Sequence, residues 1–250
     1  LNGAAVEGNL LAFELGRYYV YQPNFFKETK VEDNDVDYTF ESILAYRSKR
    51  LEGYQSKKLA KKYEQLCNKS KDLNQNLGSS VARGYYKLIA YKDEYEVARL
   101  HTEYLENQVK NSFSGYKQLR FNLAPPLFSK RDKNGHLIKK EFGPWMFTLM
   151  KLLAKGKYLR GTWLDPFHFT KERLTERKLI SQYERDVDYI IEYYNENNHD
   201  ACMNLALLPL QIRGFGHVKE QAIDKSDKIR SNLKAIISGD HSNQKLSAAE

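Results

Sequence analysis

The segment from Arg213 to Lys219, with the sequence RGFGHVK, has the residue types and spacing most like a binding site in this chain. The candidate contact residues are Arg213, Gly214, Gly216, His217 and Lys219. The two glycines allow the backbone to take positive φ or to approach a ligand closely. If the last helix begins here, its free N–H groups favour an anion, and the three basic side chains add donors. The segment is therefore a candidate anion-binding or interdomain contact.

The same segment also fits a purely structural interpretation. In that interpretation the two glycines make a tight turn between helices, and Phe215 fills the core. Arg213 would then pair with a carboxylate such as Asp165. The two interpretations differ in the effect of mutation. Loss of Arg213 or His217 should impair function without unfolding under the first interpretation, and unfold the chain under the second.

Acid–base or metal chemistry needs groups that face each other, and the sequence offers only a weak carboxylate pair. Glu94 and Glu96 are two positions apart, and residues two apart on a helix do not face each other. We therefore predict that both carboxylates take part in ion pairs on the surface or between helices. The six histidines are isolated, and none belongs to an HxxxH or HExxH pattern that could hold a metal.

Sequence motifs for common cofactors are not found in the chain. It has no GxSxG, Walker or GxGxxG motif, and the glycines at 214 and 216 give only GxGxxK. Gly239-Asp240 lacks the following Asn-Asn of a thiamine-diphosphate motif. Cys67 and Cys202 are the only cysteines, so no four-cysteine cluster is available. We therefore predict no catalytic, cofactor-binding or metal-binding residue within these 250 residues.

The elements that would position these residues are predicted to be mainly α-helical. Apolar spacing predicts helices over 4–21, 37–73, 80–113, 170–194 and 201–210, and a last helix that opens within 212–220. Gly78, Ser79 and Ser80 are typical of one helix ending and another starting. The two longest helices should therefore pack as an antiparallel helical hairpin, with the shorter helices and one small antiparallel β-hairpin beside it.

The β-hairpin is predicted in the middle of the chain. Residues 119–123 alternate between apolar and polar, as a strand does. Asn134-Gly135, between the basic arms 127–131 and 136–142, is the strongest short signal for a hairpin turn. The apolar helix that follows, from Trp145 to Leu153, is expected to lie mostly in the core.

Charge and cysteine usage limit the environment and the partners. The net charge of +8, with basic residues along the predicted helix 37–73, permits nucleic acid, acidic lipid or an acidic protein without selecting one. No run of about 18 apolar residues occurs, so no transmembrane helix is expected. The low cysteine count suits a reducing compartment, and we expect a cytoplasmic location. The opening residues lack Met and a basic region, so we expect an internal start of a longer chain.

Five separated segments resemble a single family. They are VARGYYKLIAYKDEYEVARL from Val81, FNLAPPL from Phe121, KKEFGPW from Lys139, LRGTWLDPF from Leu159 and IRGFGHVKE from Ile212. Together they are similar to the C-terminal helical domain of the large single-chain indolepyruvate ferredoxin oxidoreductases, of the 2-oxoacid:acceptor type. The opening LNGAAVEGNLLAFELGR resembles the segment that closes the preceding catalytic domain of those chains. The resemblance spans about residues 1–225.

The resemblance implies a domain organisation. Residues 1–21 would end the preceding catalytic domain, and residues 22–36 would form a linker. Residues 37–224 would form the helical domain with its β-hairpin insert. Residues 225–250 would be a polar tail or a further linker, because the apolar stripe of the last helix fades there.

The resemblance also implies a function for the parent protein. Members of the family oxidatively decarboxylate an aryl-2-oxoacid to an acyl-CoA, with thiamine diphosphate, iron–sulfur clusters and CoA, and they pass electrons to ferredoxin. The parts that hold those cofactors lie outside these 250 residues, so no ligand residue is carried over. The chain is then expected to be a non-catalytic structural and interface domain. Its partners would be the remainder of the parent chain and, through the parent, ferredoxin.

Alternatives to that expectation stay open. A basic helical module that binds nucleic acid or an acidic protein is the second hypothesis, although no known nucleic-acid motif accompanies the basic residues. A homo-oligomer is compatible with the resemblance, and a membrane partner is not expected. A salt titration of nucleic-acid affinity separates the two hypotheses, because phosphate binding weakens steeply as salt increases.

Overall fold

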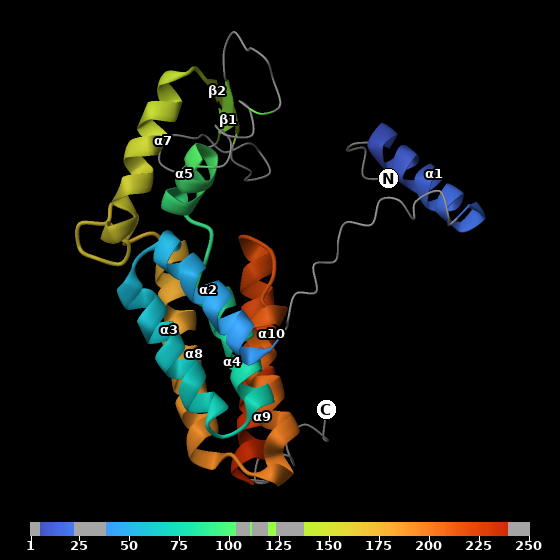
Figure 1. Ribbon diagram of the computed structural model, residues 1–250, viewed down its shortest axis with the longest axis vertical. Coiled ribbons are helices and arrows are strands. Elements are labelled where there is room, and N and C mark those ends of the chain that lie inside the picture. Colours follow the sequence, from blue (N-terminus) through green and yellow to red (C-terminus); the bar gives the residue numbers. More distant parts are fainter. Residues whose placement is uncertain (1–5, 23–38, 104–110, 112–119, 124–137, 240–250) are drawn as a thin grey trace. The chain divides into compact units, whose positions relative to one another are not determined.

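The computed structural model of the chain describes residues 6–22, 39–103, 111, 120–123 and 138–239 (Figure 1). The chain divides into two units, residues 1–38 and residues 39–250, and each is described by itself. The first unit contains helix α1 (Val6–Tyr21), in which no residue is buried. The predicted helix that ends at Tyr21 is therefore confirmed from residue 6 onward. Most of the predicted linker 22–36 lies outside the described residues.

The second unit is mainly helical. Its described elements are α2 (Phe40–Tyr54), α3 (Lys57–Lys71), α4 (Gln75–Ile89), α5 (Glu94–Glu103), β1 (Phe121–Leu123), β2 (Lys140–Phe142), α7 (Trp145–Lys155), the 3-10 helix η2 (Gly156–Leu159), α8 (Lys171–Tyr193), η3 (Glu196–Asn198), α9 (His199–Leu207), η4 (Leu208–Gln211) and α10 (His217–Ser238). Helices α2, α3, α4, α8, α9 and α10 form the bundle, and α5, α7 and the two strands form the small lobe (Figure 1). The predicted fold class, mainly α with one small antiparallel β-sheet, is confirmed.

The core of the bundle is built around stacked tyrosines. Tyr63 of α3, Tyr85 of α4 and Tyr183 of α8 stack in sequence, with ring centroids 6.0 and 5.9 Å apart. The Tyr183 hydroxyl donates to the Ala206 carbonyl oxygen at 2.7 Å, which satisfies a polar group inside the core. A Cβ at Gly84 would lie 2.1 Å from that same carbonyl oxygen, so α4 can approach α9 this closely only with glycine there.

The small lobe has its own apolar core. Ala98, Phe121, Met146 and Met150 are buried together, and β1 pairs antiparallel with β2 so that Phe121 lies opposite Phe142. The strand at 121–123 is as predicted, and it pairs directly with the end of the predicted second arm. Residues 124–137, which include Asn134-Gly135, lie outside the described residues, so the position of the turn stays a prediction.

The apolar helix after the sheet differs from its prediction. α7 buries Met146 and Met150, but Trp145, Leu149 and Leu152 are exposed. The prediction that this helix lies mostly in the core is therefore wrong for one of its faces. The reason is that α7 packs on the small lobe along one side only, because that lobe is too small to surround a helix.

The predicted single helix over 37–73 is also wrong, because two helices occupy that range. α2 ends at Tyr54, and Ser56 caps α3 by accepting a hydrogen bond from the Leu59 N–H group at 3.3 Å. The last carbonyl oxygens of α2 accept hydrogen bonds from residues in and just after η2. Lys157 donates to Gly53 at 2.7 Å and Arg160 donates to Tyr54 at 2.8 Å. The break thus depends on partners from about a hundred positions further along the chain.

The predicted helix over 80–113 is wrong in a similar way. α4 begins at Gln75, capped by Asn74, and runs through Gly78, where the sequence predicted an end. A Cβ at Gly78 would lie 2.8 Å from Lys71 Cα, so the glycine permits close packing and not a stop. α4 then ends at Ile89. α5 begins at Glu94, and the side chain of Asp93, just before it, accepts a hydrogen bond from the Glu96 N–H group. The helical hairpin exists, but α3 and α4 form it with a connection at residues 72–74.

The last two long helices lie side by side and run in the same direction in the bundle (Figure 1). α8 confirms the helix predicted over 170–194 and buries a stripe at Leu179, Tyr183, Val187 and Ile190. Thr170 caps it by accepting a hydrogen bond from the Arg173 N–H group. α10 continues to Ser238, so the prediction of a polar tail from residue 225 is wrong as far as residue 238. Ion pairs to α8 hold this polar stretch of α10 in place. Residues 240–250 lie outside the described residues.

Two of the ion pairs between α8 and α10 meet at Asp186. Arg230 binds one oxygen of this buried carboxylate at 2.7 Å, and Lys234 binds the other at 2.7 Å. An apolar stripe also continues along α10, because Ile229, Leu233 and Ile237 pack on the core of the bundle. The prediction that the stripe fades after residue 225 is therefore wrong.

Candidate functional site

The segment 213–219 begins α10, as its sequence predicted. α10 starts at His217, and Gly214 and Gly216 both have positive φ, 89° and 56° respectively. A Cβ at Gly214 would lie 2.6 Å from Val218 Cγ1, so the space there is also restricted. The first N–H groups of α10 have no side-chain cap from the preceding Gly216. The local backbone thus has the form that the anion-binding hypothesis needs.

The side chains of this segment do not converge on one point. Arg213 is exposed and donates to the Leu210 carbonyl oxygen at 3.2 Å. Phe215 is 85% exposed, and His217 is also exposed. Two parts of the structural interpretation are therefore wrong, because Phe215 does not fill the core and Arg213 pairs with no carboxylate among the described residues. Its third part, a tight turn made by the two glycines between η4 and α10, agrees with their positive φ.

Lys219, the last candidate residue, is turned toward α8. Its ammonium group pairs with Glu176, and one position later Glu220 pairs with Lys171 at 2.5 Å. The hydrogen bond from Lys171 lowers the pKa of Glu220 below its ordinary value. These ion pairs fasten the first turn of α10 to the first turns of α8. They leave Arg213 and His217 as the exposed basic residues of the original set.

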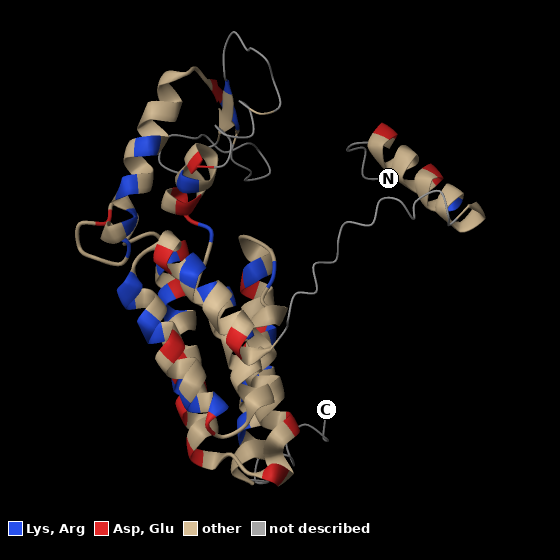
Figure 2. Cartoon of the chain, in the orientation of Figure 1, with Lys and Arg blue, Asp and Glu red and all other residues tan. Residues whose placement is uncertain are grey.

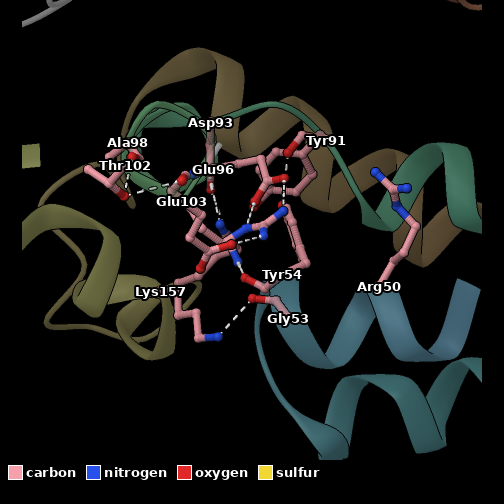
Figure 3. Close-up of polar contacts among 12 residues, drawn as sticks. Arg50, Gly53, Tyr54, Tyr91, Asp93, Glu96, Ala98, Thr102, Glu103 and Lys157 are labelled. Atoms are coloured by element: carbon pink, nitrogen blue, oxygen red, sulfur yellow. Dashed lines mark hydrogen bonds and ion pairs between the residues drawn. The ribbon is translucent and has the colours of Figure 1, made fainter. Parts of the chain in front are cut away.

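A more strongly built polar arrangement lies between the small lobe and the bundle (Figure 3). We call it the junction, and its centre is the ion pair of Arg160 with Asp93, whose side chains are only 4% and 1% exposed. The guanidinium binds both carboxylate oxygens, with Nε–Oδ2 at 2.6 Å and Nη2–Oδ1 at 2.9 Å. Burial by itself would lower the pKa of Arg160, but hydrogen bonding to Asp93 and the nearby tyrosines raise it.

The guanidinium of Arg160 has further partners in the bundle. It lies 3.7 Å from the centre of the Tyr54 ring and donates to the Tyr54 carbonyl oxygen, while the Tyr54 hydroxyl donates to the Tyr91 carbonyl oxygen at 2.9 Å. Figure 3 shows Tyr54, Tyr91 and Asp93 gathered at this point, with Lys157 reaching Gly53. The end of α2, the start of α5 and the residue after η2 are thus joined through one buried cation.

The loop after Arg160 is fixed by Asp165. This buried carboxylate accepts hydrogen bonds from the Gly161 and Phe167 N–H groups at 3.1 and 3.0 Å, and from the Tyr95 hydroxyl at 2.9 Å. Burial raises the pKa of Tyr95, and the hydrogen bond to Asp165 adds to the effect. The Tyr95 ring also meets Phe167 edge-on. The loop is therefore anchored at its base, while Trp163 within it is 81% exposed.

The carboxylates beside the junction are occupied by arginines. Glu94 pairs with Arg173, and Glu96 binds Arg99 through two hydrogen bonds of 2.9 and 2.7 Å. The prediction that Glu94 and Glu96 take part in ion pairs is confirmed. Arg173 also lies over the ring of Tyr91, 5.1 Å from its centre. These contacts place the carboxylates Asp93, Glu94 and Glu96 in ion pairs with arginines that hold segments of the chain together.

Two surface hollows lie between α3, α4 and α8, and the smaller one borders the junction at Tyr91 and Arg160. Their volumes are about 120 and 600 Å³, and both are lined by Lys62, Tyr85 and Glu184. Lys62 and Tyr85 bind the same oxygen of Glu184, at 2.6 and 2.5 Å. Burial and this hydrogen bond raise the pKa of Tyr85, so its hydroxyl stays protonated at neutral pH. The arrangement is an ion pair with a bound hydroxyl at the edge of the bundle core.

Sequence reasoning did not single out the junction residues as a site. Arg160 and Asp93 lie 67 positions apart, and Tyr95 and Asp165 lie 70 apart, so no local spacing connects them. The one sequence feature that could have indicated a buried ion pair is the position of Arg160 between the apolar residues Leu159 and Trp163. Over the described ranges, no group of three or more His, Cys, Asp or Glu residues could hold a metal ion. No helix in those ranges is both long and apolar enough to cross a membrane.

Comparison with known proteins places the chain in a family. The family of unknown function DUF6537 matches residues 40–232. The match begins with α2 and ends within α10, so it includes both the junction and the segment 213–219. No curated protein and no solved structure was found to match the chain. Because the match covers more than half of the 250 residues, the chain belongs to the family of unknown function DUF6537.

Proposed function

We propose that this chain is a non-catalytic structural and interface domain of a 2-oxoacid:ferredoxin oxidoreductase of the indolepyruvate type. The observation that carries the proposal is the contact between the segments that resemble that family. These segments are far apart in the sequence, yet four of the five meet in pairs. Their polar groups are used to hold parts of the chain together, which is the work of a structural domain.

The first pair of segments meets at the junction. Asp93 and Tyr95, from the segment that starts at Val81, bind Arg160 and Asp165 from the segment that starts at Leu159. The contacts are buried and charged, and removal of one partner from such a pair is strongly destabilising. The two segments thus support one feature, the attachment of the small lobe to the bundle.

The second pair of segments forms the sheet of the small lobe. Phe121 to Leu123 pair with Lys140 to Phe142, and Phe121 shares its core with Ala98 from the first segment. The fifth segment opens α10 and presents Arg213 and His217 at its exposed start. We assign that end to contact with the rest of the parent protein, because exposed basic side chains and free N–H groups suit a carboxylate-bearing surface.

The chemistry of the parent would come from other parts of that protein. Thiamine diphosphate, iron–sulfur clusters, CoA and ferredoxin belong to the proposal as the cofactors and partners of the parent, in the cytoplasm. No residue of this chain is assigned to them. The domain acts by supporting and contacting the catalytic part, and so its mutations should change activity through assembly and stability.

The first test is an activity assay of the parent and of the 250-residue chain. The parent should reduce a viologen dye with indolepyruvate only when CoA is present. The isolated chain, after anaerobic reconstitution with iron and sulfide, should show no turnover and no visible absorption from a cluster. Turnover by the isolated chain, or failure of the parent with a panel of 2-oxoacids, would refute the proposal.

The second test concerns the start of α10. Arg213→Ala and His217→Ala should lower the activity of the parent, while the melting temperature of the 250-residue chain stays nearly unchanged, because both side chains are exposed. Lys178→Ala is a matched control, because it removes an exposed cation from α8 and leaves the start of α10 unchanged. If both variants instead unfold the chain and spare the specific activity of the folded parent, the segment is structural.

The second candidate function, a basic module for nucleic acid or an acidic protein, relies on the cations of α3. Lys57, Lys58, Lys61 and Lys69 are exposed along this helix, which Figure 2 shows as blue positions. Lys62 and Lys71 on the same helix are paired with Glu184 and Glu41, and these pairs reduce the net positive charge on this surface. Micromolar affinity for nucleic acid at physiological salt, falling steeply with added salt, would favour this candidate.

A further inference from the structure

A compact group of arginines lies on the bundle where α2 packs against α4. Arg47 and Arg50 come from α2, and Arg83 comes from α4. We call these three residues, together with Tyr46 and Tyr86, the arginine cluster. Figure 3 shows the side chain of Arg50 standing apart from the residues that meet at the junction. The arginine cluster is therefore separate from the junction.

Tyr86 brings the two arginines of α2 together. The guanidinium of Arg47 lies 5.0 Å from the centre of the Tyr86 ring and donates to the Ala82 carbonyl oxygen at 2.8 Å. Arg50 donates to the Tyr46 hydroxyl and lies 5.3 Å from the centre of the Tyr46 ring. Burial by itself would lower the pKa of Arg50, but its hydrogen bond to Tyr46 and the nearby Tyr86 raise it. Both guanidinium groups thus border the same tyrosine.

Helix α4 adds a third guanidinium beside that tyrosine. Arg83 is three positions before Tyr86, and residues three apart are neighbours on the surface of a helix. Arg83 is exposed, and Lys87, one turn further along the helix, is exposed as well. From Gln75 to Ile89, α4 contains no aspartate or glutamate, so no carboxylate of its own offsets these two cations.

The positive charge of the cluster has no counter-charge among the described residues. Arg47 and Arg50 find their partners in a carbonyl oxygen and in tyrosines, and none of the three arginines forms an ion pair there. Of the two glutamates of α2, Glu41 pairs with Lys71, and Glu52 is two positions from Arg50, so the two do not face each other. Like charges on neighbouring positions repel, and a bound anion would relieve this repulsion.

The chemistry of the cluster suits phosphate better than carboxylate. A guanidinium is a planar fork of donors that matches phosphate oxygens, and contacts with tyrosines orient two of these forks before any ligand binds. A terminal phosphate carries about 1.5 to 2 negative charges at pH 7, so it balances several cations where a carboxylate balances one. The Tyr46 ring is 59% exposed and offers a flat surface on which a base can stack.

We propose that the arginine cluster binds the phosphate groups of a small phosphorylated ligand of the nucleoside diphosphate class. Arg50 and Arg83 supply donors from the two helices, Arg47 adds a partly buried positive charge, and Tyr46 contacts the base. The proposal is independent of the proposed function, because it uses no residue of the junction or of the start of α10. It adds a ligand site to a domain whose other polar groups hold segments of the chain together.

The small extent of the cluster favours such a ligand over a nucleic-acid strand. A strand is bound by a groove of cations that follows its backbone over several nucleotides. Here the cations end within a turn, because residues 40–46 of α2 and 75–82 of α4 include no lysine or arginine. A short diphosphate needs only the donors that surround Tyr86.

Titration calorimetry of the 250-residue chain with ADP at low salt tests the proposal. ADP should bind at one site, AMP should bind less tightly, and adenosine should not bind measurably, because the phosphates supply most of the interaction. Arg50→Gln and Arg83→Gln should each weaken the binding of ADP about tenfold or more. Arg50→Lys keeps the charge but not the planar fork, and it should weaken binding less than Arg50→Gln does.

Lys49→Gln is the matched control for the loss of one positive charge. Lys49 is an exposed cation of α2 beside Arg50 in the sequence, but adjacent residues on a helix point to different sides. The affinity for ADP should stay unchanged in this variant. Arg50 and Arg83 are exposed, so thermal unfolding of their variants should stay close to that of the native chain and separate lost binding from lost folding.

Three other results would overturn the proposal. The first is no binding of ADP at millimolar concentration, and the second is an affinity that Arg50→Gln and Lys49→Gln lower equally, since net charge alone would then explain it. In the third, ADP does not bind but another polyanion does, and Arg50→Gln weakens that binding. A single-stranded oligonucleotide in that role would assign the cluster to nucleic acid, and a glutamate-rich peptide would assign it to an acidic protein.

Discussion

Two segments of this chain begin alike and end up in opposite environments. RGTWLD starts at Arg160 and RGFGHV starts at Arg213, and each follows its arginine with a glycine at positive φ and an exposed aromatic residue. Arg160 is buried, binds Asp93 through two hydrogen bonds and lies over Tyr54. Arg213 is exposed and donates to a nearby carbonyl oxygen.

The difference lies in the partners that the rest of the chain supplies. Asp93, just before α5, and Tyr54, at the end of α2, are distant from Arg160 in the sequence and meet it only in the folded chain. The start of α10 is instead fastened by its neighbours Lys219 and Glu220, which leaves its arginine facing solvent. Similar local sequences thus give a structural cation in one place and an exposed basic residue in the other.

The largest expected effect is at the ion pair of the junction. Asp93→Ala should reduce the free energy of unfolding by about 3–5 kcal/mol, because it leaves the buried Arg160 without its counter-charge. Urea unfolding of the 250-residue chain measures this effect. The double variant Asp93→Leu with Arg160→Met should lose less than the single one. Asp188→Ala, at an exposed position, is the control. A single variant within about 0.5 kcal/mol of the native chain would contradict the central role of the pair.

The next effect concerns the carboxylate that fixes the loop after Arg160. Asp165→Ala should cost about 2–3 kcal/mol, because the Tyr95 hydroxyl and two backbone N–H groups lose their acceptor. Asp165→Asn keeps the shape and one oxygen and should cost less. The near-ultraviolet circular dichroism of the two variants should differ if Tyr95 is released in the first. Equal stability of both variants and the native chain would show that the loop is held in another way.

A smaller effect tests the property that the two segments share. Gly161→Ala and Gly214→Ala both place a Cβ at positive φ, which costs about 1–2 kcal/mol. Gly214→Ala should be the worse of the two, because its Cβ also meets Val218 Cγ1 at 2.6 Å, whereas the space around Gly161 is open. Thermal unfolding gives the order of the two. The reverse order would contradict the backbone described at the start of α10.

The smallest effect is a pH dependence at the start of α10. The Lys171 ammonium lowers the pKa of Glu220, whose ordinary value is 4.5. A lowered pKa in the folded chain means that the stabilisation is present above pH 4.5 and is lost as the pH falls through the lowered pKa. NMR titration should show the pKa of Glu220 rising toward 4.5 in Lys171→Met. An unchanged pKa in that variant would show that the pair is not formed in solution.

The apolar spacing of the sequence predicted where helices occur, but not where one helix ends and the next begins. The helix predicted over 170–194 is confirmed as α8, because its repeated apolar face, buried at Leu179, Tyr183, Val187 and Ile190, is a local property of the sequence. The break between α2 and α3 was missed, since Arg160 and Lys157 bind the carbonyl oxygens there from distant positions. α10 was predicted too short, because its core-facing residues Ile229, Leu233 and Ile237 stand among many polar residues, two of which bind Asp186 of α8.

For the candidate site at 213–219, the sequence predicted the backbone conformation of the glycines but not the directions of the side chains. Gly214 and Gly216 have the positive φ that their residue type indicated, and α10 begins beside them. The side-chain directions of Phe215 and Lys219 could not be predicted from the sequence. They depend on whether the part of α8 beside the start of α10 presents apolar residues or a carboxylate. α8 supplies Glu176, so the lysine is paired and the phenylalanine is left exposed.

The sequence by itself determined the helical class, the strand at 121–123 and the glycine backbone at 214 and 216, because these depend on residue type and on short-range spacing. The tertiary structure alone decided which of the two arginines, Arg160 or Arg213, becomes buried. Burial of a guanidinium requires a carboxylate, an aromatic ring and free carbonyl oxygens to meet in one place. At Arg160 the carboxylate comes from Asp93, and the ring and the carbonyl oxygen both come from Tyr54, so only folding brings them together.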